Sequence, residues 1–225
     1  MNPSTPTIAA EAWAELAAGN VRFATDVAHR ALADSQHRRS ISRAQAPFAA
    51  VLGCSDSRVA AELVFDRGLG EVFVVRTAGH VVDSAVLGSI EFAVSALGVP
   101  LLVVLGHDSC GAVAAAMRSR RDGNEAGGYM RDLVERVTTS VLSAERRGLT
   151  EIDDVEREHV QVTAVELIER SDVIRSAVSD GRLGVVGVYY SLAEGLVEPC
   201  WSQRVPGLDR AGPAASGVIE AETRT

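Results

Sequence analysis

Two short fragments of the chain carry residues that could hold a metal ion. Cys54 and Asp56 lie in the fragment Cys-Ser-Asp-Ser-Arg, and His107 and Cys110 lie in the fragment Gly-His-Asp-Ser-Cys-Gly. Two thiolates and one imidazole suit zinc, a borderline-soft ion that prefers tetrahedral coordination. Three such ligands leave a fourth position for water or for another side chain, and Asp56 is the nearest candidate. The pattern therefore predicts a zinc site.

Arg58 gives Asp56 a second possible role. Arginine can hold a carboxylate through two parallel hydrogen bonds. Held in this way, Asp56 would stay off the metal and would accept a hydrogen bond from a metal-bound hydroxide. The pair of Asp56 and Arg58 is therefore a candidate gate between a closed and an open metal site.

Each fragment directly follows a short apolar run that predicts a buried strand, residues 48–53 and residues 101–106. The second run holds five consecutive aliphatic residues after Pro100, which is typical of a central parallel strand covered on both faces. If the two strands are neighbours, both fragments lie at their carboxyl ends. Ligands of open α/β sheets bind in the crevice where adjacent strands send their connections in opposite directions. The expected metal site lies in that crevice.

The rest of the chain alternates between apolar runs and amphipathic segments. This order predicts an α/β fold with an open, mostly parallel central sheet of four to five strands, flanked by helices and preceded by an N-terminal helical arm. Further strands are expected over residues 71–76 and 183–190, with a short edge strand over 195–197. Helices are expected over residues 8–23, 59–65, 83–97, 111–121, 129–147 and 155–178.

Length and composition indicate one domain. The chain has 225 residues, of which 47% are hydrophobic, enough to bury a single sizeable core. We expect residues 1–205 to form this domain, including the helical arm of residues 7–45. Residues 206–225 are rich in glycine, alanine, proline and serine, so we expect a loose C-terminal tail there.

The net charge and the spacing of the cysteines limit which binding partners and which cellular compartment we expect. Lysine and arginine number 22 against 30 acidic residues, and the net charge of −8 argues against nucleic acid or an anionic membrane as a partner. The N-terminus lacks the pattern of a signal peptide, and no apolar run reaches the roughly 18 residues that span a bilayer. Three widely separated cysteines fit reduced thiols or metal ligands. We expect a cytoplasmic protein.

Two other uses of the cysteines are less favoured. A structural zinc site usually shows paired Cys-x-x-Cys knuckles in loops, whereas these ligands are split between two strand ends. A redox pair of Cys54 with Cys110 is disfavoured because neither residue stands in a Cys-x-x-Cys motif.

Four motifs resemble those of the β-class carbonic anhydrases, which are lyases: residues 54–58, 76–80, 89–94 and 106–113. The resemblance implies one Zn²⁺ per subunit, bound by Cys54, His107 and Cys110. It implies Asp56 and Arg58 as the catalytic dyad, with Asp56 binding zinc only in a closed state. It also implies active sites at the dimer interface of a homodimer or a homotetramer.

The resemblance extends to four residues of a substrate pocket. Gln45 stands nine residues before Cys54, where the plant-like branch of the family has a glutamine that helps to bind substrate across the dimer. Phe73 and Phe92 match positions that line the apolar pocket, although plain core packing is the favoured alternative for both. Gly111 matches a position whose backbone amide meets bicarbonate. The N-terminal helix and the polar arm look better suited to wrapping a partner subunit than to completing the chain's own sheet.

The activity that the resemblance implies is the reversible hydration of carbon dioxide to bicarbonate and a proton through a zinc-bound hydroxide. Asp56, held by Arg58, would accept the hydroxide proton and orient the oxygen. His80 stands where the family commonly has asparagine, and it is a weaker candidate for a proton shuttle than for a structural role. Two alternatives stay open: a related zinc hydrolase of carbonyl sulfide or carbon disulfide, and a non-catalytic zinc-stabilised regulatory module with Asp56 fixed on the metal.

Overall fold

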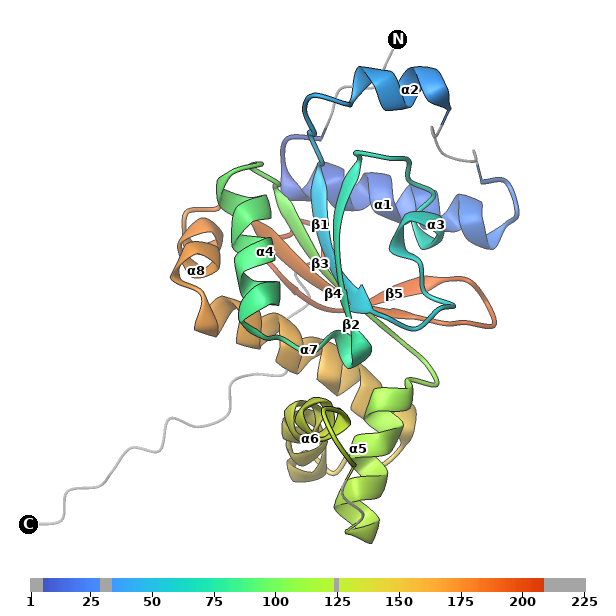
Figure 1. Ribbon diagram of the computed structural model, residues 1–225, viewed down its shortest axis with the longest axis vertical. Helices are drawn as coiled ribbons and strands as arrows, with labels where there is room; N and C mark the ends of the chain where they lie inside the picture. The colour runs from blue at the N-terminus through green and yellow to red at the C-terminus, as the bar shows by residue number, and fades with distance from the viewer. Residues whose placement is uncertain (1–5, 29–33, 124–125, 209–225) are drawn as a thin grey trace, which may run out of the picture.

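A five-stranded sheet runs through the middle of the molecule (Figure 1). The computed structural model describes residues 6–28, 34–123 and 126–208. The strand order is β2-β1-β3-β4-β5, with the first four strands parallel and β5 antiparallel to β4. Their bounds are β1 (Ala49–Cys54), β2 (Val72–Thr77), β3 (Leu101–His107), β4 (Gly184–Tyr190) and β5 (Val197–Gln203). The expected open and mostly parallel sheet is confirmed.

Strands β1, β3 and β4 are buried at every position because helices cover both faces of the sheet. β3 is central, as its aliphatic run predicted. The edge strand expected over residues 195–197 is wrong in extent, since β5 runs from Val197 to Gln203. Glu198 and Pro199 interrupt its apolar pattern, and proline is tolerated there because β5 is an edge strand.

The helices are α1 (Ala9–Ala24), α2 (Ser35–Ser40), α3 (Ala61–Val64), the 3₁₀ turn η1 (Ala78–His80), α4 (Ser84–Ser95), α5 (Gly111–Asp122), α6 (Met130–Arg146), α7 (Ile152–Arg170) and α8 (Asp172–Ser179). The prediction of a single helix over residues 155–178 is wrong, because one helix ends before Ser171 and a second begins after it. The Ser171 hydroxyl accepts a hydrogen bond from the amide of Ile174 and so caps α8.

Helices α4, α7 and α8 pack against one face of the sheet, while α1 and α3 pack against the other. Helices α5 and α6 lie beyond the carboxyl ends of the parallel strands, next to α7 (Figure 1). They form a third apolar cluster that includes the buried Cys54 and Cys110. The two cysteines of the expected metal site are therefore buried beside these helices, whereas Arg58 of the first fragment is exposed.

Helix α1 packs on the sheet of its own chain, and its expected contact with a partner subunit stays a prediction. Ala12 and Leu16 are fully buried against the sheet. The Asn20 amide donates hydrogen bonds to the carbonyls of Val64 and Gly195, at 3.0 and 2.8 Å. Helix α2 behaves differently, because it contains no buried residue and stands clear of the sheet (Figure 1).

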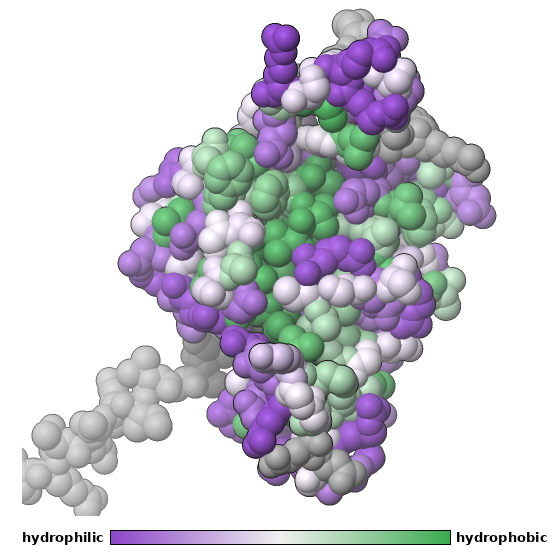
Figure 2. Space-filling view, in the orientation of Figure 1, coloured by the Kyte–Doolittle hydropathy of each residue, from purple (hydrophilic) through white to green (hydrophobic). Residues whose placement is uncertain are grey.

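The surface over β2 is apolar. Figure 2 shows hydrophobic side chains gathered along the middle of one face, over β2 and its neighbours. β2 is an edge strand that is only partly buried, and Phe92 of α4 is 48% exposed beside it. None of the described helices combines the length and the apolar character that crossing a bilayer requires.

Candidate metal centre

The three predicted ligands meet at the carboxyl ends of two neighbouring strands. Cys54 is the last residue of β1 and His107 the last residue of β3, and the two strands pair directly. Cys110 is the N-cap of α5, which follows a tight turn with Ser109 in the left-handed conformation. The ligand atoms of the three residues all lie within 4.8 Å of one another, and each residue is at most 5% exposed. The crevice expected from the sequence exists, since β1 and β3 send their connections to opposite sides.

The imidazole of His107 is oriented for metal binding. Its Nδ1 lies 2.7 Å from the carbonyl oxygen of Asp108, an atom that can only accept, so Nδ1 carries the proton. This leaves the lone pair on Nε2, which is buried and has no hydrogen-bond partner among the described residues. An unpartnered buried nitrogen between two thiols fits a Cys₂His zinc site with one open position.

Electrostatics favour a thiolate at this place. The hydrogen bond from the Cys110 thiol lowers the pKa of Cys54 below its ordinary value, although burial opposes the shift. The same contact raises the pKa of Cys110. Burial disfavours the charged form of His107, yet its contacts with Cys54 and with the Asp108 carbonyl raise its pKa overall. Negative charge gathers on sulfur, where a divalent cation would be held.

Asp56 and Arg58 lie beside the ligands and form an ion pair with each other. Asp56 Oδ1 accepts hydrogen bonds from the backbone amide and from Nε of Arg58, both at 2.9 Å, and Oδ2 accepts from Nη2 at 2.6 Å. These bonds hold the pKa of Asp56 well below its usual range. Asp56 is thus held by Arg58 and stands outside the three-ligand group. The closed state, in which Asp56 binds zinc, stays a prediction.

Arg76 fixes the turn that carries this pair. Its Nε donates to the carbonyl of Cys54 at 2.9 Å, and its Nη2 donates to the carbonyl of Asp56 at 2.6 Å. The amide of Asp56 points back to the Cys54 sulfur at 3.4 Å. The fragment that holds ligand and carboxylate is therefore tied to the end of β2.

The four predicted substrate residues are spread over the molecule. Gly111 begins α5 next to Cys110, and the space above its Cα is open. Phe73 pairs with Ala50 near the amino end of β1, with its ring centroid 6.2 Å from that of Phe92. Gln45 is exposed and precedes β1. Only Gly111 is brought to the metal ligands of its own chain.

Among the buried polar residues of α7, sequence reasoning missed two that contact the turns of the metal centre. Glu156 accepts a hydrogen bond from the Cys110 amide at 2.7 Å and one from the Tyr189 hydroxyl at 3.0 Å. His159 contacts Ser140 and the Gly79 carbonyl. The signal was present, because both residues fall at helical spacing on the stripe that also carries Val160, Ala164 and Leu167.

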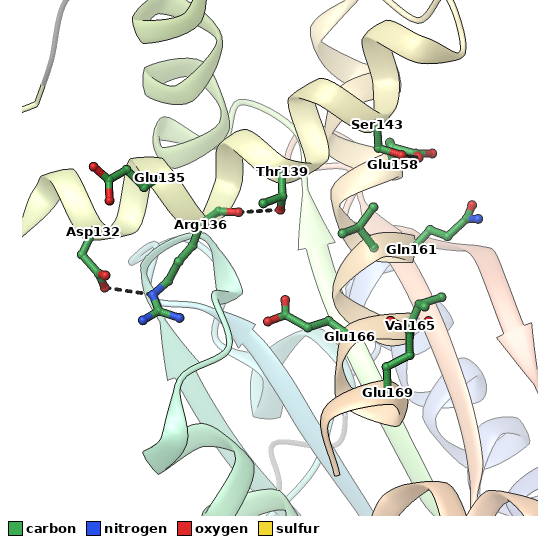
Figure 3. Close-up of a pocket in the computed structure, with 11 residues that line it drawn as sticks. Asp132, Glu135, Arg136, Thr139, Ser143, Glu158, Gln161, Val165, Glu166 and Glu169 are labelled. Atoms are coloured by element: carbon green, nitrogen blue, oxygen red, sulfur yellow. Dashed lines mark hydrogen bonds and ion pairs between the residues drawn. The ribbon is translucent and has the colours of Figure 1, made fainter.

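A hollow lies between α6 and α7, away from the metal ligands (Figure 3). Its volume is about 750 Å³, and its lining is mostly charged. Several of its carboxylates are paired with arginines: Asp132 with Arg136, Glu135 with Arg131, and Glu166 with Arg170. This groove is a solvated, ion-paired surface that shares no residue with the metal centre.

Comparison with known proteins identifies the family. Residues 49–197 match the family model described as carbonic anhydrase. Carbonic anhydrase 2 of Mycobacterium tuberculosis is 52% identical over 193 residues, covering 86% of this chain and 92% of that protein. The carbonic anhydrase of Mycolicibacterium smegmatis is 52% identical over 190 residues, covering 83% and 91%.

Solved structures agree with this match. The β-carbonic anhydrase of Coccomyxa, in complex with acetazolamide, superimposes with a TM-score of 0.68 at 26% identity, covering 83% of this chain and 85% of that one. One of two tetrameric β-carbonic anhydrases from Sordaria macrospora shares the fold with a TM-score of 0.66 at 24% identity, covering 81% and 93%. The chain belongs to the carbonic anhydrase family, in its β class.

Proposed function

We propose that this protein catalyses the reversible hydration of carbon dioxide to bicarbonate and a proton, with one zinc ion held by Cys54, His107 and Cys110. The observation that carries this proposal is the meeting of three buried ligand atoms at two strand ends, beside a carboxylate fixed by arginine. Bound zinc supplies Lewis acidity, which lowers the pKa of a water molecule from about 15.7 towards neutrality.

Asp56 accepts a hydrogen bond from the reacting oxygen. Arg58 keeps its carboxylate charged near neutral pH, so Asp56 accepts hydrogen bonds and donates none. Arg58 occupies three of the roughly four acceptor positions of this carboxylate. The remaining position can orient the reacting oxygen, whose lone pair then faces the carbon of the substrate.

Gly111 offers an anion contact for the product. It is the first residue of α5, where backbone amides have no partner within the helix and the helix dipole favours negative charge. Because no side chain occupies the space above Gly111, bicarbonate could approach its amide. This supports the role that the family resemblance assigns to Gly111.

Gln45, Phe73 and Phe92 fit a pocket that is shared between two subunits. Gln45 lines a hollow with Phe48, just before the amino end of β1, and the five residue steps of β1 at about 3.3 Å each place Cys54 about 17 Å further along the strand. Because Gln45 lies far from the ligands of its own chain, we assign it to the metal centre of another subunit. The apolar surface over β2 and the half-exposed Phe92 suit burial in such an interface. We infer a homodimer, alone or paired into a homotetramer, with active sites at the dimer interface.

A cytoplasmic location goes with this proposal. All three cysteines are free, and two of them are the proposed ligands, which must stay reduced to bind zinc. Fractionation of cells that make a tagged protein tests the location directly.

The activity is tested by stopped-flow measurement of carbon dioxide hydration by the zinc-loaded protein between pH 6.5 and 9. Carbonyl sulfide turnover, measured in parallel, should be much the slower reaction. A protein that holds one zinc per chain but hydrates no carbon dioxide throughout this range would refute the proposal.

A further inference from the structure

A buried polar chain runs from α6 to the sulfur of Cys54. The hydroxyl of Ser140 lies 2.8 Å from Nδ1 of His159, and Nε2 of His159 lies 2.7 Å from the carbonyl oxygen of Gly79. The amide of Gly79 in turn donates to Cys54 Sγ at 3.3 Å. Ser140 and His159 are at most 3% exposed, so water cannot replace either of their contacts.

These contacts fix one orientation of the imidazole. A carbonyl oxygen only accepts, so the proton of His159 lies on Nε2 and points at Gly79. Nδ1 then accepts from the Ser140 hydroxyl. Burial lowers the pKa of His159, which agrees with a neutral ring in this tautomer.

Gly79 is the residue through which His159 reaches the metal centre. Its φ of 63° lies in the left-handed region, and an added Cβ would stand only 2.7 Å from the Cβ of Ala112. The backbone there passes closely between its neighbours, and His159 holds it by the carbonyl. The ring of His80 lies against that of His159, with centroids 4.2 Å apart and ring planes inclined by 30°.

We propose that His159 is a positioning residue of the zinc centre, because it holds Gly79 so that the Gly79 amide points at the Cys54 thiolate. A hydrogen bond to a metal-bound sulfur withdraws charge from it and so tunes the metal. Without His159, Gly79 would shift, the sulfur would lose this bond, and its ligand geometry would loosen. The inference rests on the proposed zinc site but not on the reaction catalysed there.

The test uses the full chain loaded with cobalt, whose absorption bands report on metal-bound thiolate. His159→Phe keeps the ring but removes both hydrogen bonds. His159→Asn keeps a polar group facing Ser140, and His159→Gln places an amide where Nε2 donates to Gly79. We expect the thiolate-to-cobalt band to move to longer wavelength in the first two variants and to return towards its original place in the third. Competition with a chelator should show zinc affinity reduced by roughly tenfold or more in His159→Phe and His159→Asn.

Ser171→Ala is the matched control, because it removes a buried capping hydroxyl at the end of the same helix, away from the metal ligands. It should lower the melting temperature and leave the cobalt band unchanged. Unchanged spectra in folded His159 variants would overturn the proposal, as would equal shifts in His159→Gln or in Ser171→Ala. If His159→Phe does not fold, the comparison of His159→Asn with His159→Gln decides. A native protein without any thiolate-to-cobalt band would refute the metal site itself, and the role of His159 with it.

Discussion

At the scale of single residues, the metal centre divides into side chains that would hold the ion and side chains that hold those ligands. Asp56 belongs to neither group, since it contacts Arg58 and lies outside the three-ligand cluster. In this arrangement its carboxylate is available for the role that we propose on the substrate water, and the three ligands would hold zinc without it.

Asp56→Asn tests this separation. An amide keeps the shape of the carboxylate but presents one acceptor oxygen in place of two, so it cannot both bind Arg58 as before and orient the reacting oxygen. We expect carbon dioxide hydration to fall by about 10²-fold or more, with zinc content still near one per chain. Stopped-flow assays with metal analysis of the same samples measure both. Asp122→Asn, which breaks an exposed pair with Arg121, is the control and should keep full activity.

His80 gives the folded state a pH dependence. Both of its ring nitrogens are buried without a hydrogen-bond partner among the described residues, and it faces His159 from α7 and His107 from β3. Burial holds its pKa well below the ordinary 6.5, so the folded protein keeps His80 neutral while the unfolded chain binds a proton below pH 6.5. Stability is thus present above pH 6.5 and is lost as the pH falls towards the folded-state pKa.

For His80 the loss should amount to about 1.4 kcal/mol for each pH unit below 6.5. Urea unfolding of the metal-free protein at pH 8.0 and pH 5.5, beside His80→Asn, measures it. The variant should lose less stability between the two pH values, since asparagine does not titrate. Equal losses in both proteins would mean that His80 does not contribute.

At the scale of elements, the sequence correctly predicted the strands that are buried on both faces and that appear as apolar runs. The aliphatic run before His107 predicted the central strand β3, and the shorter run before Cys54 predicted β1. Because these two strands are neighbours, the two fragments that follow them lie close together. The helix break at Ser171 was not predicted, because the apolar spacing continues through Ile174 and Val178. Only the capping serine marks where one helix ends and the next begins.

Other misses arose because a pattern of apolar residues does not say what an element packs against. Helix α1 is amphipathic, but its spacing alone cannot distinguish its own sheet from a partner subunit. On α7 the buried stripe includes Glu156 and His159, polar residues that make sense only with the Cys110 amide and the Gly79 carbonyl opposite them. These partners come from distant parts of the sequence and appear only in the folded chain.

Leu16→Ala tests the packing of α1. Leu16 is fully buried against the sheet, so its truncation should cost about 2–5 kcal/mol of unfolding free energy. Urea denaturation measures the loss, with Val21→Ala as control, because Val21 lies on the same helix and is 55% exposed. The control should change stability by less than about 0.5 kcal/mol. An effect of Leu16→Ala that grows on dilution would instead place α1 in a subunit interface.

At the scale of the whole molecule, the proposed active site draws on two chains. The edge strand β2 with its apolar surface, and Gln45 at the far end of β1 from Cys54, both point to a second copy. In a symmetric dimer each metal centre would take Asp56 from one chain and Gln45 from its partner. A substitution of Asp56 and a substitution of Gln45 can then be placed on different subunits of one dimer.

A mixed dimer of Asp56→Asn and Gln45→Ala subunits tests this arrangement. Each pure variant carries its defect at both sites, whereas the mixed dimer combines both defects at one site and leaves the other intact. Random pairing of equal amounts puts half of the chains in mixed dimers, so about a quarter of all sites should regain normal activity. Co-expression with two affinity tags isolates the mixed dimer, and stopped-flow hydration measures it. If Gln45 served the metal centre of its own chain, the mixed dimer would show only the average activity of the two pure variants.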